Sequence, residues 1–380
     1  MYGFDPSSLA WIENYLSGRS QAVYIDGAFS SYKDIKTGVP QGSILGPLIY
    51  LLFTNDFPET VYSCGDESHV NNLVTNCLVC GGICCFADDS TYSVSTKDLE
   101  MLKSKLHSSY NIMANYLANN RLKLNDDKTQ LLVMTTKQKR SLHRFDVEID
   151  TGSEVIMPVR TTKLLGIEIQ DDLKWSQYIL LSNNSLVRQL NTRLSALKLI
   201  SAAANFKERL MVTNGLFSSK LIYQICLWGG AEDYLLQALQ VVQNKAVRFV
   251  TRAQKDTSLS SMRNSCGWLN VRQLVFYHSV ILIQKTLITG YRRYIYDQLP
   301  TKYSRNTRLA SSNALRLALV KRATLTLTER SFIHRASTSY NMIPAELRQL
   351  RKMSSFKSKL KIWVQLNYEH DCNPVQWRRG

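Results

Sequence analysis

Hydrophobic residues recur at three- and four-residue steps along much of this chain, a spacing that predicts amphipathic helices. A shorter run of this kind predicts a helix over residues 6–16, ended by Gly18, and the apolar stretch 43–53 predicts a buried helix. The clearest run spans residues 96–119, where one face carries Leu99, Leu102, Leu106, Tyr110, Met113 and Leu117.

Strands are predicted where apolar residues alternate or cluster beside turn residues. Residues 21–25 and 32–36 flank Asp26-Gly27, a strong hairpin signal. Residues 84–95 predict two strands around Ala87-Asp88-Asp89, and 131–134 and 164–169 predict further strands. Residues 58–82 are polar and weakly patterned, so we expect a long loop there.

Beyond Trp175 the pattern is helical almost throughout, and one helix is marked by Leu186, Leu190, Leu194 and Leu197. Another is marked by Leu235, Leu239, Val242, Ala246 and Phe249. The change in pattern predicts an α+β fold in which a mixed part ends near 172–180 and a mostly α-helical part follows. A chain of 380 residues exceeds one small core, so length alone suggests two or three domains.

Charge sharpens this division. Residues 1–150 hold 13 Lys and Arg against 17 Asp and Glu, whereas residues 151–380 hold 34 against 13, a net charge of +21. Such an excess is costly self-repulsion unless an anionic partner neutralises it, and nucleic acid is the usual partner. An acidic protein, a membrane surface or a merely solvated basic face are the alternatives.

The cysteines form no secreted disulfide framework. Cys77, Cys80 and Cys84, with Cys64 or His69 as a fourth ligand, come near zinc-site spacing, but reduced thiols in a loop are the favoured interpretation. No apolar run is long enough to span a membrane, and the N-terminus has no secretory signal pattern. We therefore expect a nuclear or cytoplasmic protein that is not secreted.

Asp88 and Asp89 are the strongest candidates for chemistry. Adjacent carboxylates repel each other unless a cation lies beside them, and their hard oxygen atoms favour Mg²⁺ or Mn²⁺ over Zn²⁺. A turn between strands would hold them as two-metal phosphoryl transfer requires. An ordinary Asp-Asp turn remains the alternative for the motif taken alone.

Neighbouring motifs favour the metal site over an ordinary turn. Gly-Val-Pro-Gln-Gly-Ser-Ile-Leu-Gly-Pro-Leu at 38–48, Phe-Ala-Asp-Asp at 86–89, Asn-Asp-Asp-Lys-Thr at 125–129 and Leu-Leu-Gly-Ile at 164–167 follow in order. They closely resemble palm motifs B, C, D and E of reverse transcriptases, particularly those of non-LTR (LINE-like) retrotransposons. Segments 239–248, 340–344 and 355–360 are similar to later parts of such elements, so the resemblance covers nearly the whole chain.

The resemblance implies roles for individual residues. Asp88 would be a Mg²⁺ ligand and Asp89 a weaker one, while Lys128 would approach the triphosphate and protonate the pyrophosphate leaving group. The alternative for Lys128 is an exposed turn lysine, and the alternative for Gly166 is a simple turn glycine. The residues that would contact nucleotide, template or primer are Pro40, Gln41 and Gly42, in a tight loop, and Gly166, in a primer-gripping turn.

The resemblance further implies a partial polymerase palm over 1–175, a thumb-like region over 176–260 and a basic helical region over 261–380. The region 176–380 would bind an RNA template and an RNA–DNA or DNA duplex, and the palm would bind dNTP. Gly3 to Ile12 resembles the stretch after motif A, whose aspartate would then precede Met1, and Asp5, Asp26 and Asp56 stand in no matching context. We therefore expect an RNA-directed DNA polymerase fragment that is inactive alone, or else a non-catalytic RNA- or DNA-binding protein derived from such an element.

Overall fold

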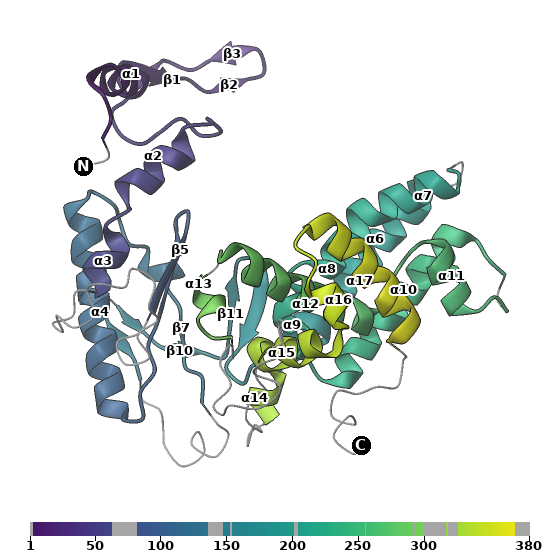
Figure 1. Ribbon diagram of the computed structural model, residues 1–380. Helices are drawn as coiled ribbons and strands as arrows, with labels where there is room; N and C mark the ends of the chain where they lie inside the picture. Colours follow the sequence, from purple (N-terminus) through teal and green to yellow (C-terminus); the bar gives the residue numbers. More distant parts are fainter. Residues whose placement is uncertain are drawn as a thin grey trace. The chain divides into compact units, whose positions relative to one another are not determined.

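The computed structural model describes residues 3–62, 82–135, 147–152, 154–200, 204–254, 256–291, 293–299, 317 and 326–368. The chain divides into two compact units, one of residues 1–128 with 149–155 and one of residues 129–148 with 156–380. The described part combines small two-stranded sheets with helices, so the fold is α+β as predicted (Figure 1). The predicted division into three parts stays a prediction.

The first unit is built from short elements. Its helices are α1 (Pro6–Leu16), α2 (Gly46–Phe53), α3 (Phe57–Tyr62) and α4 (Leu99–Asn119), with a 3₁₀ turn at Asp126–Lys128. Its strands are β1 (Arg19–Gln21), β2 (Tyr24–Ile25), β3 (Ala28–Phe29), β4 (Lys33–Ile35), β5 (Gly82–Phe86), β6 (Asp89–Ser93) and β8 (Ile149–Asp150).

Local sequence signals explain several of these elements. Asp5 caps α1 by accepting hydrogen bonds from the backbone N–H groups of Ser7 and Ser8, and Pro6 starts the helix. Asp26 and Gly27 both adopt positive φ between β2 and β3, as a two-residue hairpin turn requires. The predicted hairpin is confirmed, although pairing resumes at Ala28 and continues outward as β1 with β4.

The predictions for α2 and for residues 58–82 need correction. Helix α2 exists, but only Gly46 is buried in it, and Leu48, Leu51 and Phe53 are largely exposed. Residues 57–62 form α3 instead of starting a loop, because Phe57 and Val61 pack against Tyr116 of α4. The rest of the expected loop, 63–81, lies outside the described residues.

The second unit begins with small sheets. Its strands are β7 (Leu131–Leu132), β9 (Val155–Ile156, at the boundary of the units), β10 (Pro158–Val159), β11 (Thr161–Leu164) and β12 (Ile167–Gln170). Strand β7 pairs in parallel with β10, and β11 pairs with β12 around the two-residue turn Leu165-Gly166. The predicted strand 164–169 is therefore wrong as a single strand, because that turn lies inside it.

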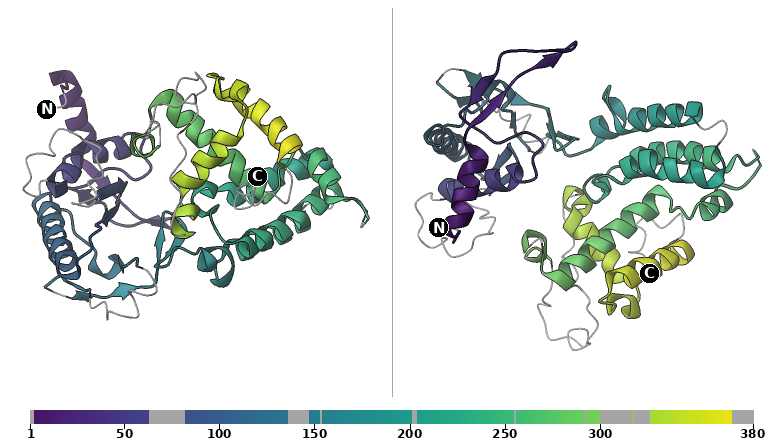
Figure 2. Two further views of the ribbon diagram at one scale, coloured as in Figure 1. Left: turned by 60° about the horizontal axis from the view of Figure 1, so that its bottom comes forward. Right: turned by 90° about the horizontal axis from the view of Figure 1, so that it is seen from above.

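Helices make up the remainder of the second unit. They are the π-helical segments η3 (Gln177–Leu181) and η4 (Asn214–Ser218) and helices α6 (Leu186–Ile200), α7 (Phe206–Thr213), α8 (Ser219–Ile222), α9 (Ile225–Trp228), α10 (Asp233–Thr251), α11 (Leu259–Ser265), α12 (Val271–Thr289), α13 (Arg293–Tyr296), α14 (Thr326–Arg330), α15 (Phe332–Met342), α16 (Ala345–Arg348) and α17 (Met353–Asn367). Helices α6, α10 and α12 lie side by side (Figures 1 and 2).

Two large apolar cores and a smaller cluster between α10 and α11 hold these helices together. One large core gathers residues of α6, α9 and α10 around the fully buried Trp228, and the other packs α12, α15 and α17 around Tyr340 and Phe356. Burying a large apolar side chain contributes on the order of 2–3 kcal/mol, so these cores dominate the stability of the unit. The helical periodicity read from residues 186–197 and 235–249 is confirmed.

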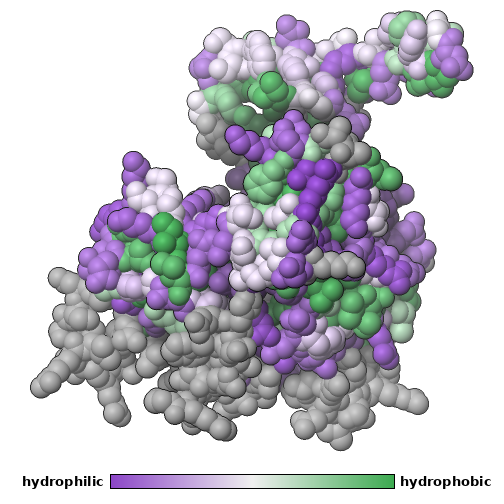
Figure 3. Space-filling view, turned by 90° about the vertical axis from the view of Figure 1, so that its right-hand side faces the viewer, coloured by the Kyte–Doolittle hydropathy of each residue, from purple (hydrophilic) through white to green (hydrophobic). Residues whose placement is uncertain are grey.

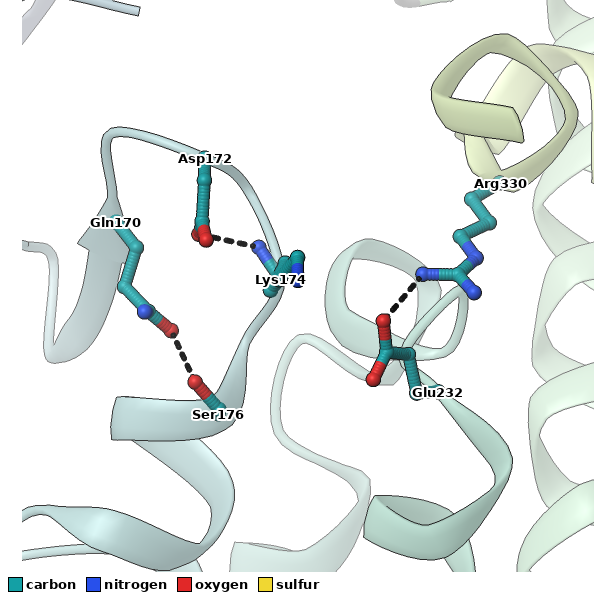
Figure 4. A network of polar contacts seen from close by, with 6 residues as sticks. All are labelled: Gln170, Asp172, Lys174, Ser176, Glu232 and Arg330. Atoms are coloured by element: carbon teal, nitrogen blue, oxygen red, sulfur yellow. Dashed lines mark hydrogen bonds and ion pairs between the residues drawn. The ribbon is translucent and has the colours of Figure 1, made fainter. Parts of the chain in front are cut away.

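Polar contacts join segments that are distant in sequence. Glu232, just before α10, accepts a charged hydrogen bond of 3.1 Å from Arg330 at the end of α14 (Figure 4). Beside this pair, Gly230 approaches the backbone of Arg330 so closely that a Cβ atom would collide with it. The Gln170 side chain accepts hydrogen bonds from Ser176 Oγ and from the backbone N–H of Gln177, which ties β12 to η3.

Candidate functional site

The Asp88-Asp89 pair lies at the turn between β5 and β6. Phe86 pairs with Asp89, so the loop consists of Ala87 and Asp88 alone, and both aspartates are exposed. Ala87 has a φ of 53°, a left-handed conformation that costs a non-glycine residue about 1–2 kcal/mol. The predicted pair of strands is confirmed, and the turn between them is a strained one.

Helix α2 brings a hydroxyl group near this turn. Burial, and after it the negative charge of Asp88, raises the pKa of the Tyr50 side chain. The Coulombic effect of Asp88 means that Tyr50 lies within its electric field. Tyr50 was not among the candidates from sequence, where it counted only as one apolar position of a helix.

The loop before α2 owes its shape to two glycines. Gly38 and Gly42 adopt φ of 78° and 80°, and Ser43 N donates to Pro40 O at 3.3 Å, which closes a tight turn. Gln41 and Gly42 are exposed in this turn and Pro40 is half-buried. The predicted tight loop is confirmed, and α2 carries it in the same unit as Asp88.

Lys128 ends the 3₁₀ turn and is exposed. Asp126, the first residue of the same turn, accepts a 2.7 Å hydrogen bond from the hydroxyl of Tyr110 on α4, which anchors the turn. Burial, and then this hydrogen bond, raises the pKa of Tyr110 to about 12. Within the described residues, no side-chain hydrogen bond or ion pair joins Lys128 or Gln41 to Asp88 or Asp89.

The donor atoms at the turn fit a divalent cation in part. Two exposed carboxylates are hard oxygen donors of the kind that Mg²⁺ accepts, with water and phosphate oxygens completing its shell. Among the residues that the structure describes, no group of three or more His, Cys, Asp or Glu side chains is placed to hold a metal. Two of the acidic residues near the N-terminus have structural partners instead: Asp5 caps α1, and Asp56 accepts from the Tyr116 hydroxyl.

The cysteine hypothesis concerns mostly undescribed residues. Cys64, Cys77 and Cys80 lie outside the described part, as does His69. Cys84 lies in β5, not in a loop, and is exposed.

Gly166 belongs to the second unit. It follows Leu165 in the β11–β12 turn, where both residues have positive φ, as the predicted hairpin turn requires. The Tyr223 hydroxyl donates a 2.8 Å hydrogen bond to Leu165 O and so ties the turn to the end of α8. No helix of the described ranges is long and apolar enough to cross a membrane.

Comparisons with known proteins agree with this arrangement of motifs. Residues 2–169 match the family model described as reverse transcriptase (RNA-dependent DNA polymerase). Over 254 residues the chain is 23% identical to the RNA-directed DNA polymerase from mobile element jockey of Drosophila melanogaster, covering 66% of this chain and 26% of that protein.

Two more relatives come from the same fly. The probable RNA-directed DNA polymerase from transposon X-element is 24% identical over 63% of this chain and 24% of its own length. The probable RNA-directed DNA polymerase from transposon BS is 24% identical over 63% of this chain and 25% of its own. The chain thus spans about a quarter of the length of the curated relatives it matches.

Proposed function

We propose that residues 2–169, which match the reverse transcriptase family model and are similar to polymerases of mobile elements, act as the palm of an RNA-directed DNA polymerase. One observation carries the proposal. Asp88 and Asp89 lie next to each other at the strained β5–β6 turn, and the negative charge of Asp88 acts on Tyr50 of the helix that follows the glycine-bearing loop.

Asp88 and Asp89 would hold the catalytic divalent cation, Mg²⁺ or Mn²⁺. When bound, the metal would supply Lewis-acid stabilisation of the charge that develops during nucleotidyl transfer. Asp88 is the principal ligand in this proposal, because it stands within the turn, and Asp89, at the first position of β6, is the weaker one.

The other motif residues act on substrate. Gln41 and Gly42, with Pro40 shaping their turn, contact the incoming dNTP and the template, since a glycine lets the backbone approach a ligand closely. Lys128, exposed after the anchored Asp126, places its ammonium group near the triphosphate and donates a proton to the leaving pyrophosphate. Gly166 holds the primer end.

Residues 176–380 would serve as a thumb and its basic extension. The net charge of +21 over residues 151–380 supports binding of an RNA template and an RNA–DNA or DNA duplex through phosphates. Polymerisation by these 380 residues alone is not part of the proposal. Two-metal transfer needs ligands that bridge both ions, and Asp88 and Asp89 come from one turn. This binding of nucleic acid would take place in the nucleus or cytoplasm.

Metal binding tests the role of the two aspartates. We expect Mn²⁺, followed by its electron paramagnetic resonance signal, to bind the chain, and the pair of changes Asp88→Asn and Asp89→Asn to abolish that binding. The matched control is Asp26→Asn with Asp34→Asn, two carboxylates of the β1–β4 hairpin, which should leave binding unchanged. Equal binding by both double variants would contradict the metal role.

The same charge excess favours a second candidate, a non-catalytic RNA- or DNA-binding protein. Primer extension on an RNA template with Mg²⁺ and dNTPs separates the two when the chain is compared with Asp88→Ala. Incorporation lost in Asp88→Ala would show that the chain completes a catalytic site. Salt-sensitive binding together with Mn²⁺ binding that ignores both aspartates would instead support the non-catalytic protein.

A further inference from the structure

Three basic side chains from three different elements gather around the Leu165-Gly166 turn. Lys163 lies on β11 just before the turn, Arg193 on α6 and Lys220 on α8 (Figure 1). Lys163 is exposed, whereas Arg193 and Lys220 are half-buried. Because they are 57 positions apart at the extremes, no single sequence motif marks them as a group.

Specific contacts fix two of these cations in place. Arg193 Nη1 donates a 2.7 Å hydrogen bond to Leu216 O, and Lys220 Nζ lies 5.6 Å from the centre of the Tyr223 ring. The Tyr223 hydroxyl donates in turn to Leu165 O. A cation–π contact and a carbonyl acceptor hold the charges without neutralising them.

Lys220 lies close enough to the other two cations to be repelled by them. Burial, followed by repulsion from Arg193 and Lys163, lowers the pKa of Lys220. Among the described residues, no carboxylate lies within ion-pair distance of any of the three, although Glu168 stands opposite Lys163 in the hairpin register. Like charges held close together are unfavourable by themselves and become favourable when an anion binds between them.

We propose that Lys163, Arg193 and Lys220 form a phosphate-binding cluster that holds consecutive phosphates of a nucleic-acid strand passing the Leu165-Gly166 turn. The identity of the ligand rests on the proposed function, since an acidic protein would satisfy the same charges. Arg193 keeps N–H groups beyond the one given to Leu216, and guanidinium groups pair with phosphate oxygens through two parallel hydrogen bonds. Contacts of this kind position a strand without reading its sequence.

Salt-dependent binding of a fluorescein-labelled RNA–DNA hybrid, measured by anisotropy in EDTA, tests the cluster. The variant is Lys163→Gln with Arg193→Gln and Lys220→Gln. The control removes the same charge from exposed positions elsewhere in the second unit: Lys207→Gln, Lys352→Gln and Lys359→Gln. Each lost phosphate contact lowers the slope of log affinity against log salt by about 0.7–0.9, so we expect a drop of about 2 in the cluster variant and a clearly smaller one in the control.

Folding and charge are checked separately. Both triple variants should melt cooperatively by circular dichroism, and the cluster variant should lose only a little stability, because it gives up the hydrogen bond from Arg193 to Leu216 O but replaces no fully buried side chain. The charge-preserving variant Lys163→Arg with Arg193→Lys and Lys220→Arg should keep most of the affinity. An equal drop in slope for cluster and control would overturn the proposal, because net charge alone would then explain binding.

Two further experiments identify the class of ligand and show which of the two proposals fails. Polyglutamate should compete only weakly; if it binds the cluster as tightly as the hybrid does, the ligand is an acidic protein and the proposal fails. Mn²⁺ binding is measured without the hybrid, whereas hybrid binding is measured in EDTA, where the metal site takes no part. Loss of Mn²⁺ binding therefore reports on the palm proposal, and loss of salt slope reports on the cluster.

Discussion

The two units differ sharply in how they bury their apolar residues. In the second unit most large apolar side chains of α6, α9, α10 and α12 enter two continuous cores. In the first unit the main cluster of buried apolar residues is Phe57, Val61 and Tyr116, while Ile44 is 95% exposed and Trp11 is 56% exposed. Hydrophobic groups also appear among polar ones on the face drawn in Figure 3.

The residues that carry the motifs and the residues that stabilise the fold therefore lie mostly in different units. The motifs that reveal the family lie mostly in short turns of the first unit, whose conformations are set locally by glycine, aspartate and proline. The energy that holds the described fold together lies mostly in the helical unit. Mutations should therefore divide into those that damage the site and those that damage the fold.

Replacing one tryptophan in each unit should give the largest difference in stability between the two units. Trp228 is fully buried and donates from its indole N–H to Tyr223 O, so Trp228→Ala should lower the free energy of unfolding by about 3–5 kcal/mol. Trp11→Ala, on the exposed face of α1, should change it by less than about 0.5 kcal/mol. Urea unfolding followed by circular dichroism measures both. Equal midpoints for the two variants would erase the contrast between the units.

Two glycines sharpen the contrast within the helical unit. Gly230→Ala places a Cβ atom against the Arg330 backbone and should cost about 1–3 kcal/mol. The control Gly215→Ala has open space around its Cβ in the helical segment η4 and should be neutral or slightly stabilising. If Gly230→Ala unfolds at the same urea concentration as Gly215→Ala, the close approach of α14 to the start of α10 is wrong.

Acid should produce a smaller, local effect in the first unit. Hydrogen bonds from Ser7 and Ser8 lower the pKa of Asp5 below its usual value. The stabilisation is therefore fully present above the unfolded pKa of about 3.9 and is lost as pH falls through the lower folded pKa. We expect the Ser7 and Ser8 amide hydrogens to lose exchange protection in strong acid, and to lose it at every pH in Asp5→Ala. Protection that Asp5→Ala leaves intact would show that α1 needs no cap.

Much of this fold was predictable because it is encoded locally. The Asp26-Gly27 hairpin and the strands beside Asp88 follow from turn residues, and α1, α4, α6 and α10 follow from helical periodicity. The motifs predicted a resemblance to reverse transcriptases, and residues 2–169 match that family model. The burial of α2 was not predictable, since an apolar run does not tell which surface covers it.

The site shows the same limit. The turn at Asp88 could be read from four residues, but the nearness of Tyr50 depends on how α2 packs. Lys163, Arg193 and Lys220 come from segments that are only adjacent after the helices assemble. Groups that depend on tertiary contacts give no periodic or spacing signal, so they were missed.

The hydrogen bond from Tyr223 to Leu165 bears on how tightly a ligand can bind at this turn. It fixes the β11–β12 turn to α8 before any ligand arrives, while the two positive φ angles already restrict the turn itself. A surface that is ordered in advance loses less conformational entropy on association than a loop that must fold around its partner. Tyr223→Phe should therefore weaken binding of the hybrid in the same anisotropy titration, because the freed turn must be ordered again when the strand binds.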